Sequence, residues 1–150
     1  MTKNINLILH NIRSAHNVGS IFRTADAAGV AKIYLTGYTP APTEDKVKKT
    51  ALGAEKTIPW EKAGQIAPLL KRLKKERIGI VALELSPNSI DYRKFKPKFP
   101  LALIVGNEVK GLSKAVLENV DKIIAIPMYG KKESLNVSVA TGIAIYKIIE

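Results

Sequence analysis

No cysteine occurs in this chain of 150 residues, which excludes disulfide bonds and thiolate metal sites. No apolar run approaches the roughly 18 residues of a membrane span, and the apolar stretch near the N-terminus is too short for a signal peptide. Internal repeats and low-complexity segments are also missing. We therefore expect one soluble domain over residues 1–150, located in the cytoplasm.

Acidic residues and familiar nucleotide motifs are scarce as well. The chain has 13 Asp and Glu against 24 Lys and Arg, a formal net charge of +11. This excess favours a polyanionic partner, although a generally basic or merely solvated surface has the same composition. Neither a Gly-x-Gly-x-x-Gly nor a Walker sequence occurs, and the two histidines do not have metal-ligand spacing. Dinucleotide, nucleoside-triphosphate and zinc sites lack support, and we expect no metal.

Hydrophobic residues make up 46% of the chain, and their spacing predicts an α/β fold. A strand at 5–10, a helix through residue 28 and a strand at 32–36 form a strand-helix-strand unit, with Gly29 closing the helix in a left-handed conformation. Such a unit favours a parallel sheet.

Three later runs are apolar along most of their length, which is typical of strands covered on both faces. They lie at 78–83, 101–105 and 122–126. The remaining helices are predicted at 68–77 with Leu69, Leu70 and Leu73 inward, at 114–119 with Ser113 as N-cap, and at 137–149 with Asn136 or Ser134 as N-cap.

Two segments break the regular pattern. From Gly37 to Trp60, prolines and glycines predict a long surface excursion with at most a short helix. Between Asp91 and Phe99, aromatic residues alternate with cations, a combination suited to stacking on bases and neutralising phosphates. The same aromatic residues are equally compatible with an edge loop that packs into the core.

Polar residues gather after three of the predicted strands, in segments 11–23, 106–113 and 128–136. Open α/β sheets bind ligands at the carboxyl ends of their strands, so we expect these segments to form one site. Gly106 and Gly111 frame the second segment, where the missing Cβ atoms would let a ligand approach the main chain.

Each polar residue in these segments also has an ordinary structural interpretation. Asn17 and Asn136 are good helix N-caps, and Glu108 is compatible with a surface carboxylate. His10 and His16 have no evident partner, and we interpret them as structural or at the edge of the site.

Three motifs occur in order: NVGSIFRTA at 17–25, LIVGNEVKGLS at 103–113 and IPMYGKKESLNVSVA at 126–140. In order and spacing they resemble the motifs of the SpoU-type RNA ribose 2′-O-methyltransferases of the SPOUT superfamily, and the resemblance covers residues 5–148. It implies a C-terminal trefoil knot, S-adenosylmethionine as methyl donor, a homodimer, and tRNA or rRNA as partner. The alternative is a non-catalytic RNA-binding or ribosome-assembly protein of the same fold.

The resemblance also implies roles for individual residues. It assigns activation of the ribose 2′-hydroxyl to Arg23. Because a guanidinium stays protonated in proteins, we favour a charged Arg23 that orients the hydroxyl or adjacent phosphate and stabilises oxyanion character. Asn17 would hold Arg23 or cap its helix, and Glu108 would pair with Arg23 or Asn17. Ser134 with Asn136 would complete a polar ring. The residues implied for S-adenosylmethionine are Leu83, Gly106, Ile126, Met128 and Leu135.

Many relatives carry an additional N-terminal RNA-binding domain, and this chain shows no such extension before its first motif. We therefore expect RNA to be held by basic loops and by the second subunit, since dimerisation roughly doubles the phosphate contacts.

Overall fold

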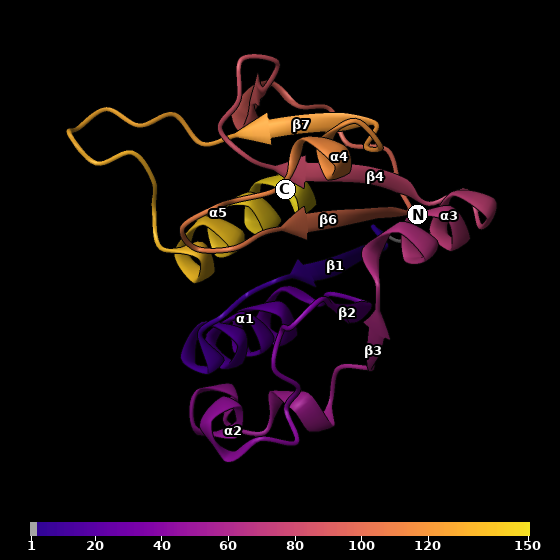
Figure 1. Cartoon of the computed structure of the whole chain (residues 1–150), viewed down its shortest axis with the longest axis vertical. Coiled ribbons are helices and arrows are strands. Elements are labelled where there is room, and N and C mark those ends of the chain that lie inside the picture. The colour runs from indigo at the N-terminus through magenta and orange to yellow at the C-terminus, as the bar shows by residue number, and fades with distance from the viewer. Residues whose placement is uncertain (1–2) are drawn as a thin grey trace.

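A parallel sheet between two layers of helices forms the protein in a computed structural model that describes residues 3–150 (Figure 1). Within these residues the sheet has the strand order β3-β2-β1-β6-β4-β7-β5, and every neighbouring pair is parallel. The predicted α/β class with a helix-flanked parallel sheet is confirmed. The strands are β1 Ile5–His10, β2 Lys32–Thr36, β3 Trp60–Gly64, β4 Gly79–Leu83, β5 Ile90–Asp91, β6 Leu101–Val105 and β7 Lys122–Ala125.

The helices divide between the two faces of the sheet, each with its own apolar cluster. On one face lie α1 Ala15–Ala28, α2 Asp45–Ala51 and α5 Val137–Ile149. On the other lie α3 Ile66–Lys75 and α4 Lys114–Leu117. Two short 3₁₀ helices, η1 Ala54–Lys56 and η2 Tyr92–Lys94, complete the described elements.

The central strands β1 and β6 show why such runs are apolar along most of their length. Leu7 and Leu103 face the α1 and α5 layer, whereas Ile8 and Ile104 face the α3 layer, and all four side chains are fully buried. Successive side chains of a strand point to opposite faces, so a strand covered on both sides favours apolar residues at successive positions. The prediction of doubly covered strands is confirmed here.

Most predicted helix ends agree with the structure. Gly29 is left-handed, with φ 76°, and its N–H closes α1. Ser113 caps α4 by accepting a hydrogen bond from the N–H of Val116, although that helix ends two residues earlier than expected. The α3 helix begins at Ile66 and ends at Lys75, two residues earlier at each end than expected, so Pro68 lies in its first turn, where a missing N–H costs nothing.

The segment from residue 37 to 60 differs from its prediction. A short helix, α2, is present as expected, but Val47, Ala51 and Ile58 are buried, and α2 packs against α1. The interpretation as a surface excursion is therefore wrong for this part. Strand β3 follows directly and was not predicted, because its sequence WEKAG has little apolar character.

The aromatic residues between 91 and 99 follow the second of their two interpretations. Tyr92, Phe95 and Phe99 are half-buried and pack against the core cluster of the α1 and α5 face. They are therefore not free to stack on bases. Arg93 is held by Asp91 through a salt bridge of 2.6 Å.

The connection between β7 and α5 loops outward beyond the carboxyl edge of the sheet before the chain returns to the helix (Figure 1). The predicted trefoil knot in this C-terminal part stays a prediction. Among the described residues, no helix has the length and apolar character that a membrane crossing requires.

Candidate functional site

A cavity lies at the carboxyl ends of β4, β6 and β7, and we call it the carboxyl-edge cavity. Its walls come from segments far apart in sequence: the end of β4, the loop after β6, and the connection from β7 to α5. The structure therefore brings the second and third motifs together, as predicted. The cavity is lined by Leu83, Glu84, Leu85, Val105, Gly106, Asn107, Glu108, Val109, Gly111, Ala125, Ile126, Met128, Glu133, Ser134, Leu135, Val137 and Ala140.

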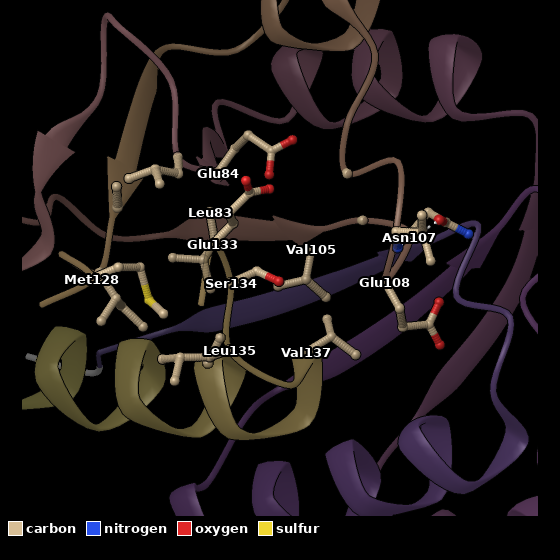
Figure 2. A pocket seen from close by; sticks show the side chains of 17 residues that line it. Leu83, Glu84, Val105, Asn107, Glu108, Met128, Glu133, Ser134, Leu135 and Val137 are labelled. Carbon is tan, nitrogen blue, oxygen red and sulfur yellow. Dashed lines mark hydrogen bonds between the residues drawn. The ribbon is translucent and has the colours of Figure 1, made fainter. Parts of the chain in front are cut away.

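The predicted donor-site residues all belong to this lining. Figure 2 shows Leu83, Met128 and Leu135 around one space, with Ser134 beside them. An apolar lining with a few polar groups is typical of a small-molecule site, because apolar walls bury a planar ring and polar groups fix its orientation. The remaining members of the predicted set, Gly106 and Ile126, line the same cavity.

Gly106 and Gly111, in the loop after β6, are needed for a reason other than the approach of a ligand that we expected. A Cβ on Gly106 would lie 2.6 Å from Cδ2 of Leu112, and a Cβ on Gly111 would lie 2.2 Å from Oε2 of Glu84. Gly111 also has a positive φ of 65°. The space left by the missing side chains is thus filled by protein atoms, and the glycines allow the loop to fold tightly beside the cavity.

Glu84 holds this loop from the end of β4, and sequence reasoning missed it. Its Oε2 accepts a hydrogen bond of 2.7 Å from the N–H of Leu112. Burial raises the pKa of the Glu84 carboxyl, while the hydrogen bond from Leu112 acts in the opposite direction. Its carboxylate lies at the side of the cavity in Figure 2. The sequence did hold one signal for Glu84, because this residue directly follows a predicted buried strand.

Glu108 lies at the other end of the cavity, against the start of α1 (Figure 2). Its carboxylate accepts hydrogen bonds from the N–H groups of Arg13 at 3.0 Å and Ser14 at 2.9 Å, and from Nδ2 of Asn17 at 3.2 Å. Burial alone would raise the pKa of Glu108, but these donors, together with the main-chain N–H of Glu108 itself, outweigh it and lower the pKa. The carboxylate is therefore kept charged at the N-terminus of a helix, where negative charge is favourable.

Asn17 connects this carboxylate to the third motif. Its Nδ2 donates to Glu108, and its Oδ1 accepts a hydrogen bond of 3.2 Å from Nδ2 of Asn136. The expectation that Asn17 caps α1 is wrong, because Ser14 is the N-cap and Asn17 lies in the first turn. Of the two predicted partners of Glu108, the structure shows Asn17.

Asn136 begins α5, as one of the two predicted N-caps. Its Oδ1 accepts hydrogen bonds from the N–H groups of Ser138 at 2.9 Å and Val139 at 3.3 Å. Ser134, the other candidate cap, instead lines the carboxyl-edge cavity. The predicted polar ring is therefore divided: Ser134 faces the cavity, whereas Asn136 fixes the helix behind it.

Arg23 lies apart from these residues. It lines a second groove with His16, Lys49 and Tyr146, which we call the Arg23 groove, and this groove shares no residue with the carboxyl-edge cavity. The donors to the Glu108 carboxylate are Arg13, Ser14 and Asn17, so Arg23 is not among them. The expectation that Asn17 or Glu108 holds Arg23 is not met within residues 3–150 of a single chain.

The two histidines have separate surroundings. Nδ1 of His10 lies 2.8 Å from Oγ1 of Thr36, and Nε2 lies 3.3 Å from Nδ2 of Asn11. Burial lowers the pKa of His10, which favours a neutral ring between these partners. His10 is therefore structural, while His16 lies in the Arg23 groove.

A third hollow lies beside Glu108, and we call it the Tyr38 groove. It is lined by Arg13, Ser14, Asn17, Tyr38, Asn107, Glu108, Val109 and Lys110. Sequence reasoning missed Tyr38 and Asn107, although each follows the end of a strand. Nδ2 of Asn107 donates hydrogen bonds to the hydroxyl of Tyr38 at 2.8 Å and to the carbonyl of Asn11 at 3.0 Å.

Comparisons with known proteins agree with these features. The sequence model of the SpoU rRNA Methylase family matches residues 4–146. The chain is 37% identical over 142 residues to a putative TrmH family tRNA/rRNA methyltransferase, YacO, of Bacillus subtilis, covering 95% of this chain and 57% of that protein. It is 38% identical over 146 residues to a tRNA (guanosine(18)-2'-O)-methyltransferase of Aquifex aeolicus, covering 97% of this chain and 68% of that protein.

A solved structure has the same fold. The AdoMet-bound rRNA methyltransferase from Sinorhizobium meliloti superposes with a TM-score of 0.90 at 31% identity, covering 99% of this chain and 56% of that one. The chain thus spans little more than half of the length of this protein and of the Bacillus relative. The prediction of a single domain without an N-terminal extension stays a prediction.

Proposed function

Because the chain belongs to the SpoU rRNA Methylase family, we propose that it transfers a methyl group from S-adenosylmethionine to a ribose 2′-hydroxyl of tRNA or rRNA. One observation carries this proposal: Leu83, Gly106, Ile126, Met128 and Leu135 line one cavity at the carboxyl edge of the sheet. A cytoplasmic location is part of the proposal, since tRNA and rRNA are its substrates.

The carboxyl-edge cavity fits a nucleoside-containing donor. Leu83, Ile126 and Leu135 supply apolar walls for a purine ring, and Glu84 offers a carboxylate for hydroxyl or ammonium groups. S-adenosylmethionine supplies an electrophilic methyl group on a sulfonium sulfur. The tight turn at Gly106 and Gly111 fixes the wall of the cavity, so that positioning contributes to the rate.

Charge supports RNA as the acceptor. The chain carries a net charge of +11, and the side chains of Arg13 and Lys110 are exposed beside the cavity. A cationic surface binds phosphates with release of counterions, so affinity for RNA should fall steeply as salt rises. An affinity that does not change with salt would argue against this part of the proposal.

A second copy of the chain would complete the site. The exposed side of α5 carries Val139, Ile143 and Tyr146, which are 51%, 36% and 50% exposed. Tyr146 also lines the Arg23 groove, so the apolar side and Arg23 belong to one continuous surface. The exposed positions of α5 are thus apolar, and an exposed apolar side of a helix is typical of an interface. We include in the proposal a homodimer that places Arg23 of one chain at the carboxyl-edge cavity of the other.

Arg23 would then act as a fixed positive charge. A guanidinium remains protonated, so its role is to orient the 2′-hydroxyl or adjacent phosphate and to stabilise negative charge that develops on the attacking oxygen. Glu108 and Asn17 hold the start of α1, which carries Arg23 on its exposed side. Their contribution is therefore to position the helix.

The alternative, a non-catalytic RNA-binding or ribosome-assembly protein, predicts no donor binding. Calorimetric titration with S-adenosylmethionine separates the two, and nucleoside analysis of incubated tRNA and rRNA then identifies the methylated atom. The proposed function requires saturable donor binding and a 2′-O-methyl nucleoside. RNA binding without donor binding would favour the alternative, and a methyl group on a base would overturn the proposed ribose chemistry.

A further inference from the structure

The Tyr38 groove has the composition of a nucleotide-binding surface, and the proposed function assigns no role to its aromatic wall. Tyr38 is 59% exposed and Val109 is 93% exposed, so the groove offers an aromatic ring and an aliphatic side chain to solvent. Large exposed apolar groups within a hollow are unusual unless a partner covers them. A nucleobase presents a flat apolar face and polar edges, which match this lining.

Two neighbouring strand ends hold the Tyr38 ring in place. Its hydroxyl accepts a hydrogen bond of 2.8 Å from Nδ2 of Asn107, and its main-chain N–H donates to Oδ1 of Asn11 at 3.2 Å. Asn107 in turn accepts from the N–H groups of Val109 at 2.9 Å and Lys110 at 2.8 Å. The ring is thus tied to the loop that forms the opposite wall, and little rotational freedom remains to be lost on binding.

The polar groups around the ring are available to a ligand. The phenolic hydrogen of Tyr38 has no acceptor among residues 3–150, because the one hydrogen bond of this hydroxyl is the one that it accepts. The salt bridges within the same residues do not include Arg13 or Lys110. Two exposed cations on the rim of a hollow with an aromatic wall are suited to the phosphates on either side of a bound base.

The Tyr38 groove continues into the carboxyl-edge cavity. Asn107, Glu108 and Val109 line both. A ribose at this junction would have its 2′-hydroxyl towards the cavity. Its base, attached at the neighbouring carbon, would extend into the Tyr38 groove.

We propose that the Tyr38 groove binds the base of the nucleotide that is methylated, with the Tyr38 ring as stacking platform and Arg13 and Lys110 at the flanking phosphates. This inference rests on the proposed function and specifies its substrate: the base must leave the RNA stack, so the groove takes a nucleotide in a loop or one that is flipped out of a helix. Stacking tolerates any base, so the groove does not select one by itself.

The test compares Tyr38→Leu with Tyr38→Phe, using bulk tRNA and rRNA from the host as substrate. Tyr38→Leu removes the stacking ring and should lower kcat/KM for RNA by about 10- to 100-fold. Tyr38→Phe keeps the ring and loses only the hydroxyl, so it should retain activity to within about 5-fold, the cost of one uncharged hydrogen bond. Both variants should bind S-adenosylmethionine as the parent does, because Tyr38 does not line the carboxyl-edge cavity.

A control is Asn119→Leu, the removal of an uncharged exposed side chain after α4 that lines none of the three hollows. It should leave kcat/KM within about 2-fold of the parent, as for a surface substitution. A Tyr38→Leu protein as active as this control would overturn the subsite while leaving the proposed function intact. Equal losses in Tyr38→Leu and Tyr38→Phe, or a loss of donor binding, would also overturn it, because they indicate a role in holding Asn107.

A second readout does not depend on catalysis. Trp60 is the single tryptophan, so Tyr38→Trp in a Trp60→Phe background carries one fluorescent ring in the groove. Adding RNA to saturation should quench this fluorescence by stacking, whereas the fluorescence of Trp60 in the parent, which lines none of the three hollows, should respond less. Quenching that is equal at both positions would contradict the proposal. If RNA quenches the fluorescence of the Tyr38→Trp protein but the parent forms no 2′-O-methyl nucleoside, the proposed function would instead be refuted.

Discussion

The carboxyl-edge cavity and the Arg23 groove belong to the same chain, but their side chains are held very differently. The Glu108 carboxylate beside the cavity accepts three hydrogen bonds, one of them from Asn17. Asn17 in turn accepts a hydrogen bond from Asn136. Arg23 is exposed, and it shares its groove with an exposed aromatic side chain of α5. One half of the proposed machinery is therefore ordered within a chain, whereas the other half faces outward and would be completed by a second molecule in the proposed dimer.

Substitution of Arg23 should have the largest effect. Arg23→Ala should lower the rate of methyl transfer by about 100-fold or more, the cost of losing one group that stabilises developing negative charge. Donor affinity should stay within a few-fold, because Arg23 does not line the cavity. Single-turnover transfer and calorimetric titration measure the two quantities, and Lys49→Ala in the same groove is the control for lost charge. A parallel loss of donor affinity would contradict the assigned role.

Mixed dimers show which chain supplies Arg23. A chain with Arg23→Ala has an intact cavity, and a chain with Gly106→Leu has an intact Arg23 but a displaced loop at the wall of the cavity, because the added side chain would overlap Leu112. If Arg23 acts across the interface, mixing the two inactive proteins should restore about a quarter of the sites, one in each mixed dimer. No recovery after subunit exchange would mean that Arg23 acts within its own chain.

Gly106→Ala should have the next largest effect, because Gly106 lines the carboxyl-edge cavity. The added Cβ would lie 2.6 Å from Cδ2 of Leu112 and 3.0 Å from the carbonyl carbon of Gly111, so the loop must shift. We expect a loss of about 1–3 kcal/mol in the free energy of unfolding, with weaker donor binding. Chemical denaturation and calorimetry measure both. Gly130→Ala is the matched control, because a Cβ there has no atom within 4 Å; equal effects at the two glycines would be against this explanation.

A similar contrast, between features set by local sequence and features set by tertiary contacts, explains which parts of the structure could be predicted from the sequence. Strands such as β1 and β6 and the caps at Gly29, Ser113 and Asn136 follow from local apolar runs and turn chemistry, and they agree with the structure. The cavity follows from the rule that ligands bind at the carboxyl ends of parallel strands. These features depend on neighbours in sequence or on a general property of the sheet.

The features that were missed depend on tertiary contacts, with one exception. Strand β3 is an edge strand that pairs with β2 alone, so its main-chain hydrogen bonds hold it without an apolar sequence. Burial of residues 47, 51, 54 and 58 did have a signal, because these apolar residues recur every three or four positions. The separation of Arg23 from Glu108 had no signal in the sequence, because helical spacing does not show which side of α1 a second chain would cover.

Asn136→Ala should have a moderate effect, because it removes both the cap of α5 and the bond to Asn17. The loss of an N-cap costs about 1 kcal/mol in the free energy of unfolding. Asn136→Ser keeps a capping oxygen but is too short to repeat the bond to Asn17, so it should recover most of the stability and less of the activity. Denaturant unfolding and methyl-transfer assays measure the two. Equal stability of the Ala and Ser variants would show that capping is not the function of this side chain.

The smallest expected effect is the pH dependence contributed by Glu108. Its pKa is lowered in the folded protein, so it contributes stability that is present above the ordinary pKa of a glutamate, about 4.3. That contribution is lost as the pH falls through the lower, folded-state value. Glu108→Gln keeps the shape but not the charge, and should reduce the free energy of unfolding at pH 7 by less than about 1 kcal/mol, because water screens the partly exposed carboxylate.

The difference between parent and Glu108→Gln should therefore shrink as the solution is acidified below the ordinary pKa of a glutamate. Denaturant unfolding in a series from neutral to acidic pH measures this difference. In an Asn17→Ala background one of the three donors to the carboxylate is gone, so the pH-dependent part should be smaller. A difference that grows on acidification would mean that the charge of Glu108 destabilises the start of α1, and that the ordered half of the site is held by Asn17 and Asn136 alone.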